Sequence, residues 1–219
     1  MQFQLPYSGL QWSDLPYVLL GVWNTLILTL AAATFGTLIG VVIGWLRQDV
    51  PVARIVLAPY VDVTRSVPLI IQFILVNSSF ALAGIPLEPL WVGVIVLSLY
   101  MGVLTSELVR AGLGAVRFQL KWASRSLGMS YWQELRYVSA PLALRTFFPG
   151  WIGTVIALTK DTALVSVVGY VELLRASQVL INRTNEALLV LAGTGLFYFA
   201  ICYPISLYSR RLERTFQHD

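Results

Sequence analysis

Long uncharged stretches alternate along this chain with short segments that carry the ionisable residues. The uncharged runs are Leu15 to Leu46, Val67 to Leu87, Pro89 to Ser106 and Ala187 to Ser209. A fifth apolar stretch, Thr146 to Val171, is interrupted by Lys160 and Asp161. Because a helix needs about 20 apolar residues to cross the hydrocarbon core of a bilayer, hydropathy predicts four or five transmembrane helices.

The placement of basic residues decides between these two counts. Of the 15 Lys and Arg residues, three lie between the first two runs (Arg47, Arg54, Arg65), six lie from Arg110 to Arg145, and three follow the last run (Arg210, Arg211, Arg214). Short cytoplasmic loops collect Lys and Arg, so the N-terminus is expected outside and the 110–145 loop and the C-terminus inside. Three of the apolar runs precede that loop. Since the loop and the C-terminus are on the same side, an even number of crossings must follow it, so the interrupted stretch Thr146 to Val171 counts as a span and the total is five.

These spans divide the chain into three parts. We expect an extracytoplasmic N-terminus at 1–14, an all-α transmembrane domain at 15–209 and a cytoplasmic tail at 210–219. The first sixteen residues contain Asp14 but no Lys or Arg, so the basic leader of a cleavable signal peptide is not evident. Within the first span, Gly36, Gly40 and Gly44 recur at four-residue spacing, which favours close packing against another helix of the same chain.

Composition supports an integral membrane protein and excludes several function classes. The chain of 219 residues is 57% hydrophobic and only 12% charged, too few ionisable groups to cover a water-soluble globule of this size. Its single Cys202 and single His218 exclude a disulfide framework, a Cys/His metal cluster and a His-based triad. The net charge of +4 follows from the cytoplasmic loops and does not indicate a nucleic-acid partner.

The cytoplasmic loop, at about 117–141, carries the clearest local signals. They predict a short amphipathic helix that ends at Gly128, a polar turn through Ser130 and a second helix that stops at Pro141. The small residues Ala123 and Ser124 would allow another protein to approach this loop closely.

This loop resembles the coupling motif in the membrane permeases of binding-protein-dependent ATP-binding-cassette importers. That motif has a Glu-Ala-Ala start, a Gly four residues after the last Ala, and Ile-x-Leu-Pro ten residues beyond the Gly. Ala123, Gly128, Val138 and Pro141 stand at the matching positions. The chain departs from the motif where Trp122 replaces Glu, Ser124 replaces the second Ala and Ala140 replaces Leu.

Further matches select the polar amino-acid branch of these permeases. They are Gly21 and Thr25-Leu26, then Arg65-Ser-Val-Pro68-Leu69, then Glu107-x-x-Arg110, and last the run from Lys160-Asp161-Thr162 to Gly169 and Glu172. The resemblance implies the type I importer fold, with five spans, in a bacterial cytoplasmic (inner) membrane. It also implies a cytoplasmic ATPase dimer that binds ATP and Mg, an extracytoplasmic amino-acid-binding protein and a second permease subunit. This chain would bind no cofactor, since it has no Gly-x-x-x-x-Gly-Lys-[Ser/Thr] phosphate loop.

Two sets of candidate site residues follow, and neither is catalytic or metal-binding. The ATPase-coupling set is Trp122, Ala123, Ser124, Leu127, Gly128 and Pro141, and the substrate-pathway set is Pro68, Gln72, Glu107, Lys160, Asp161, Thr162 and Glu172. Glu107 and Arg110 stand three apart on a helix and can form an ion pair. Lys160 and Asp161 are consecutive, so we expect them to have separate partners, in the pathway or in the packing. Glu172 is expected in a short helix near the outer face, either gating or solvated.

Trp122 bears on the number of different permease subunits. An indole cannot make the charged contacts of the family's Glu, although it can anchor in an apolar groove. A second permease with a regular Glu-Ala-Ala loop would compensate, so the sequence favours a heterodimer. A homodimer stays open if Glu134 or the ATPase supplies the missing charge.

Other classes of function fit less well. A stand-alone secondary transporter or channel would need internal repeats or more helices, and neither is visible. A membrane enzyme would need a nucleophile with a base, paired Asp residues or a metal motif, and none occurs. The carried amino acid stays open, because acidic residues (Glu107, Asp161, Glu172) and basic residues (Arg65, Arg110, Lys160) are both at hand.

Overall fold

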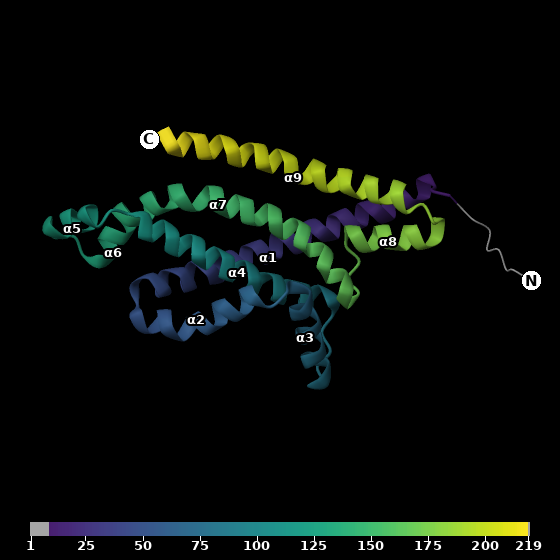
Figure 1. The fold of residues 1–219 in the computed structure, drawn as a ribbon, viewed down its shortest axis with the longest axis horizontal. Helices are drawn as coiled ribbons and strands as arrows, with labels where there is room; N and C mark the ends of the chain where they lie inside the picture. Colours follow the sequence, from purple (N-terminus) through teal and green to yellow (C-terminus); the bar gives the residue numbers. More distant parts are fainter. Residues whose placement is uncertain (1–8, 219) are drawn as a thin grey trace, which may run out of the picture.

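The computed structural model describes residues 9–218, which fold into helices without any β-strand. The elements in chain order are η1 (Trp12–Asp14), α1 (Leu15–Asp49), α2 (Pro51–Ser66), α3 (Leu69–Leu82), α4 (Pro89–Ala115), α5 (Phe118–Ser126), α6 (Tyr131–Glu134), η2 (Leu135–Ser139), α7 (Ala140–Asp161), η3 (Thr162–Val168), α8 (Leu173–Thr184) and α9 (Ala187–His218). Figure 1 shows α1, α4, α7 and α9 running along the long axis of the molecule, with α3 projecting away from them.

Four helical stretches are long and apolar enough to cross a membrane. They are Trp12–Asp49, Pro89–Ala115, Tyr131–Val168 and Ala187–Arg214. A fifth span exists if α2 and α3, which meet at an angle of 109°, count as one broken span. The chain is therefore a multi-pass helical membrane protein with four to five spans, and the predicted number of five depends on this bent pair.

The bend between α2 and α3 differs from the sequence prediction. We expected Arg54 and Arg65 in a loop before a straight span at Val67 to Leu87, but both arginines lie in α2, and α3 has only 14 residues. Pro68 is the cause, because proline disfavours the helical conformation of the residue before it. Val67 is accordingly extended, with φ −85° and ψ 126°, and α2 ends there.

The two ends of the molecule carry different elements. Figure 1 places α5, α6 and the C-terminal end of α9 at one end, and the start of α1 together with α8 at the other. The candidate coupling loop and the C-terminal helix end therefore share a side, as the distribution of basic residues predicted.

The α1 helix packs against α4 through its glycines. Gly36, Gly40 and Gly44 are all buried. A Cβ atom on Gly40 would lie 2.4 Å from the Cβ of Thr105 and 2.6 Å from the carbonyl oxygen of Gly102. Only a residue without a side chain allows the two backbones to come so close. The expectation that the glycine spacing serves packing within the chain is therefore confirmed.

The prediction that a helix stops at Pro141 is wrong. The backbone continues from α6 through the π-helical segment η2 into α7, where Pro141 occupies the first turn. A proline is tolerated in a first turn because it needs no backbone donor there. The wider π turn also takes up the irregularity, with the N–H of Ala140 donating to the carbonyl of Leu135.

Candidate coupling loop and transport pathway

The α5 helix ends in a backbone geometry that requires Gly128. The N–H of Met129 donates to the Ser124 carbonyl at 3.2 Å, and the N–H of Gly128 donates to the Arg125 carbonyl at 3.0 Å. These two bonds form a Schellman cap, in which the residue before the last, here Gly128, takes the left-handed conformation. Gly128 has φ +81°, which glycine adopts without strain. The predicted helix end at Gly128 is confirmed.

The coupling set divides into a solvent-facing part and an inward-facing part. Trp122 and Leu127 are 70% and 83% exposed, and Ala123 and Pro141 are also exposed. Ser124 is buried, and its hydroxyl donates to the carbonyl of Lys121 at 2.8 Å. We call the exposed apolar side chains of Trp122 in α5 and Leu127 at its C-cap the exposed surface of α5, while the side chain of Ser124 is buried within its own chain.

The turn after α5 is stabilised by a capping box. The Ser130 hydroxyl accepts from the N–H of Gln133, and the Gln133 side chain accepts from the N–H of Ser130 at 2.8 Å. Glu134, the residue considered as a substitute for the family's Glu, is buried and accepts a hydrogen bond from the Ser139 hydroxyl. Its carboxylate therefore faces its own chain and not the exposed surface of α5.

Glu107 belongs to a three-residue ion-pair network. Its carboxylate contacts Arg110 at 2.9 Å within α4, as its spacing predicted, and Arg47 of α1 at 2.5 Å. The side chain of Arg47 is only 9% exposed, so this pair neutralises a guanidinium that would otherwise be buried unpaired. The sequence pattern missed Arg47, because its position after an apolar run is typical of a loop cation.

Lys160 and Asp161 lie at the C-terminal end of α7. Within residues 9–218 neither side chain forms a hydrogen bond or an ion pair, although the charge of Lys160 acts on the Asp161 carboxylate. The expectation of separate partners stays a prediction. Lys160 is exposed and Asp161 is partly buried. Asp161 and Arg65 both lie close enough to Tyr100 of α4 for their charges to act on its hydroxyl. The structure thus brings Arg65 of α2 to the same region as Asp161.

Three other pathway candidates are placed by hydrogen bonds or by the bend. The side-chain amide of Gln72 donates to the carbonyls of Thr64 and Val67, both at 2.9 Å, and so holds the α2–α3 bend. Pro68 forms that bend and is exposed. Thr162 is fully buried, and its hydroxyl donates to the carbonyl of Thr159 at 2.8 Å.

Glu172 is the N-cap of α8 and is fully buried, with 0% exposure. Its carboxylate accepts from the N–H groups of Leu174 and Arg175, both at 2.7 Å, and from the hydroxyl of Tyr198 at 3.2 Å. Burial raises the pKa of Glu172, and the three hydrogen bonds oppose this rise. The short helix is confirmed, and the alternative that Glu172 is solvated is wrong, because its carboxylate is buried and anchors the helix to α9.

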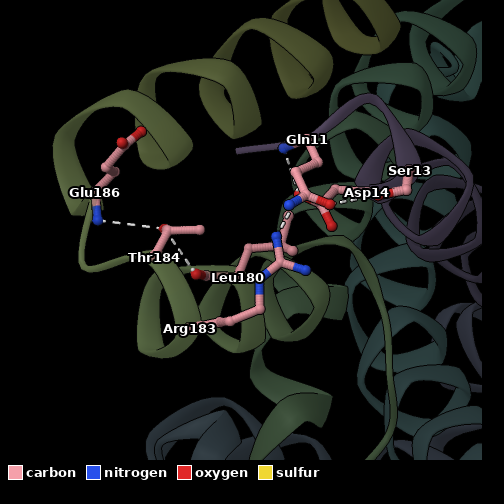
Figure 2. A network of polar contacts seen from close by, with 7 residues as sticks. All are labelled: Gln11, Ser13, Asp14, Leu180, Arg183, Thr184 and Glu186. Carbon is pink, nitrogen blue, oxygen red and sulfur yellow. Dashed lines mark hydrogen bonds and ion pairs between the residues drawn. The ribbon is translucent and has the colours of Figure 1, made fainter. Parts of the chain in front are cut away.

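A second contact anchors α8 to the start of α1, as Figure 2 shows. The carboxylate of Asp14 forms an ion pair with Arg183 near the end of α8 and accepts from the N–H of Gln11 at 2.9 Å. Thr184 closes α8, with its hydroxyl donating to the Leu180 carbonyl at 2.8 Å and accepting from the N–H of Glu186 at 3.3 Å. The α8 helix is thus fixed at both ends.

The geometry defines a multi-pass membrane protein with an exposed helical loop at one end and, within residues 9–218, two charged residues at the end of α7 that form no ion pair or hydrogen bond. A family model described as "binding-protein-dependent transport system inner membrane component" matches residues 36–218. The chain belongs to this family, and the resemblance that its motifs indicated is confirmed.

Relatives and solved structures agree with this membership. The chain is 29% identical to a glutamine transport system permease protein of Escherichia coli K12, covering 96% of this chain and 97% of the relative. It is 31% identical to an L-cystine transport system permease protein of Bacillus subtilis 168, covering 96% and 91%. A crystal structure of an amino acid ABC transporter with histidines matches with a TM-score of 0.85 and 28% identity, covering 93% of this chain and 95% of that one. An inward-facing methionine ABC transporter shares the fold, with a TM-score of 0.80, over 94% of this chain and 99% of its own.

Proposed function

We propose that this chain is the permease subunit of an ATP-driven amino-acid importer in a bacterial cytoplasmic membrane. It provides half of the translocation pathway and works by alternating access. A separate cytoplasmic ATPase dimer binds ATP and Mg, and an extracytoplasmic binding protein delivers the amino acid. The relatives named for glutamine and L-cystine transport support this substrate class.

The exposed surface of α5 is the observation that carries this proposal. The side chains of Trp122 and Leu127 are 70% and 83% exposed. Burying such side chains is favourable by roughly 2 kcal/mol each, so their exposure favours a surface that a partner protein covers. A groove on the ATPase would cover them. Since α5 is joined to the membrane helices on both sides, closure of the ATP sites would then move those helices.

Gly128 tests the coupling. Gly128→Val places a β-branched residue at φ +81°, which costs roughly 1–3 kcal/mol and redirects α5. In proteoliposomes with the ATPase and the binding protein, we expect import and substrate-stimulated ATP hydrolysis to fall together by about tenfold, the equivalent of 1.4 kcal/mol.

Gly128→Asn is the matched control, because Asn tolerates the left-handed conformation. Its import should stay near that of the wild type, and all three proteins should insert in equal amounts. Normal coupled import in the Val variant would remove this loop from the mechanism.

We place the α5 end of the molecule in the cytoplasm and α8 outside. Six basic residues from Arg110 to Arg145 lie at or near the α5 end, and cytoplasmic segments carry this excess.

Cysteine labelling tests this orientation on a Cys202→Ser background. A Cys at Asn182 of α8 should react with a membrane-impermeant maleimide in intact cells. A Cys at Gln119 of α5 should react only after permeabilisation. Both positions are exposed, so accessibility of the side chain is matched, and the opposite labelling pattern would refute the orientation.

The substrate pathway passes Asp161, Lys160 and Arg65 in our proposal. A charge at membrane depth costs about 2.5–3.5 kcal/mol on insertion scales, and Lys160 and Asp161 have no hydrogen-bond or ion-pair partner in the described part of the chain to offset it. An amino acid carries both an ammonium and a carboxylate, which these groups can bind. Pro68 lies at the neighbouring bend. Four other candidates have a structural role in this proposal, because their polar groups already bond to the protein itself: Glu107, Gln72, Thr162 and Glu172.

Asp161→Asn distinguishes a residue that binds the substrate from one that only stabilises the fold. A charge-assisted hydrogen bond contributes about 1.5–3 kcal/mol, so the KM for import should rise roughly tenfold or more. The unfolding temperature should not fall, because the substitution removes a charge that costs free energy at membrane depth. Glu172→Gln should show the reverse, with a lower unfolding temperature and a nearly unchanged KM. An unchanged KM for Asp161→Asn in a fully assembled complex would exclude Asp161 from the pathway.

We favour a heterodimer with a second permease. Trp122 lacks the charge of the family's Glu, and Glu134, which would compensate within this chain, bonds to Ser139 instead. A partner with a regular Glu-Ala-Ala loop would supply the charged contact to one ATPase subunit.

The subunit composition is measurable by co-expression with the ATPase alone. We expect no stable, transport-competent assembly without the second permease. Native mass spectrometry of the detergent-purified complex gives the number of copies. An active complex with two copies of this chain would exclude the obligatory heterodimer and leave the permease function intact.

A further inference from the structure

Asp49 stands in an electrostatically unfavourable place. It is the last residue of α1, where the free carbonyl groups carry partial negative charge and favour cations. Its carboxylate, however, accepts a hydrogen bond from the hydroxyl of Tyr131, the first residue of α6. A residue that opposes the helix dipole is therefore explained by a contact with the coupling loop.

The Tyr131 hydroxyl joins two residues of α1. It donates to Asp49 and accepts from the indole N–H of Trp45 at 2.7 Å. Trp45 and Asp49 stand four residues apart and so lie on the same face of the helix. One phenol thus uses both its donor and its acceptor on the last turn of α1.

The other side of Tyr131 contacts the coupling helix. The guanidinium carbon of Arg125, in the last turn of α5, lies 5.7 Å from the Tyr131 ring centroid, within the range of a cation–π interaction. The next residue, Trp132, packs on Trp45 with ring centroids 5.5 Å apart. Tyr131 is therefore in contact with α5 through its ring and with α1 through its hydroxyl.

The end of α1 leads directly to the candidate pathway. Val50 is extended, with φ −115° and ψ 106°, and α2 begins at Pro51. The other end of α2 carries Arg65 and the bend that Gln72 holds. A displacement of Asp49 therefore acts on α2, which is otherwise remote from α5 along the chain.

We propose that Tyr131 is a positioning residue that transmits the movement of α5 to the α1–α2 junction. This inference rests on the proposed coupling function. The loop then acts on the membrane domain by two routes, covalently through α4 and α7, and non-covalently through the hydroxyl of Tyr131. The second route brings the bent α2–α3 pair into the same conformational change.

Tyr131→Phe tests the proposal in proteoliposomes that contain the complete importer. The substitution keeps the ring, and thus the contact with Arg125, but removes both hydrogen bonds to α1. We expect complex assembly and basal ATP hydrolysis to match the wild type, while the number of amino acids imported per ATP hydrolysed falls at least threefold. This ratio separates a positioning role from a loss of stability, which would lower both activities together.

Tyr137→Phe is the matched control. Tyr137 also lies in this loop with an arginine, Arg136, 5.7 Å from its ring centroid, but its hydroxyl makes no hydrogen bond to the described residues. Its removal should leave the import ratio unchanged.

Variants of Asp49 provide a second test. Asp49→Ala should lower the import ratio as much as Tyr131→Phe, and Asp49→Asn, which keeps an acceptor oxygen, should restore most of it. The double variant Tyr131→Phe with Asp49→Ala should be no worse than Tyr131→Phe alone, because the bond that Asp49→Ala removes is already absent there.

The outcomes are distinguishable. If the wild-type importer is active, three results would overturn this inference and leave the proposed function intact. They are a normal import ratio in Tyr131→Phe, an equal loss of that ratio in Tyr137→Phe, and additive losses in the double variant. Absence of ATP-dependent import in the wild-type complex would overturn the proposed function, and this inference with it.

Discussion

The close approach of α1 and α4 is the constraint on which the rest of the structure depends. Gly36, Gly40 and Gly44 present backbone instead of side chains, so α4 comes near enough that an added Cβ at any of the three would lie 2.4–2.6 Å from an atom of α4. The α7 helix packs against this pair, contacting α4 and also α1, and α9 packs on α7. The ion pair between Arg47 and Glu107 lies at one end of the same interface, so sliding of either helix would break the pair and leave the buried guanidinium of Arg47 unpaired.

The parts that we propose to move are attached at the ends of this closely packed pair. The coupling loop follows α4 at one end, and the bent α2–α3 pair follows α1. At the opposite end, α8 is held by the buried cap of Glu172 and by the ion pair of Arg183 with Asp14. A helix pair that resists deformation transmits displacement better than a loosely packed one, since packed interfaces shift between discrete arrangements and do not bend continuously.

The parts of the fold that could be predicted are those that local physics determines. Apolar runs located the long helices, the glycine spacing located their tightest contact, and Gly128 with Ser130 located the end of one loop helix and the start of the next. The α2–α3 bend was missed because hydropathy cannot distinguish a straight span from two short helices at an angle. The π turn before Pro141 was missed because that proline also fits the end of a helix. The partner of Glu107 on α1 was missed because a contact across 60 residues leaves no local pattern.

The same limit applies to the candidate pathway, because local sequence patterns do not show long-range contacts. Sequence patterns selected polar residues within apolar stretches without showing which of them are already satisfied. Glu107, Gln72, Thr162 and Glu172 each bond to other groups of the protein, and such bonds offset the cost of burying them. Lys160 and Asp161 lack this compensation among residues 9–218. A charge in an apolar span without a hydrogen bond or ion pair is destabilising by itself, and we propose that a molecule outside the chain binds these two. In our proposal a zwitterionic amino acid would supply both opposite charges and leave again, which a fixed ion pair within the protein would prevent.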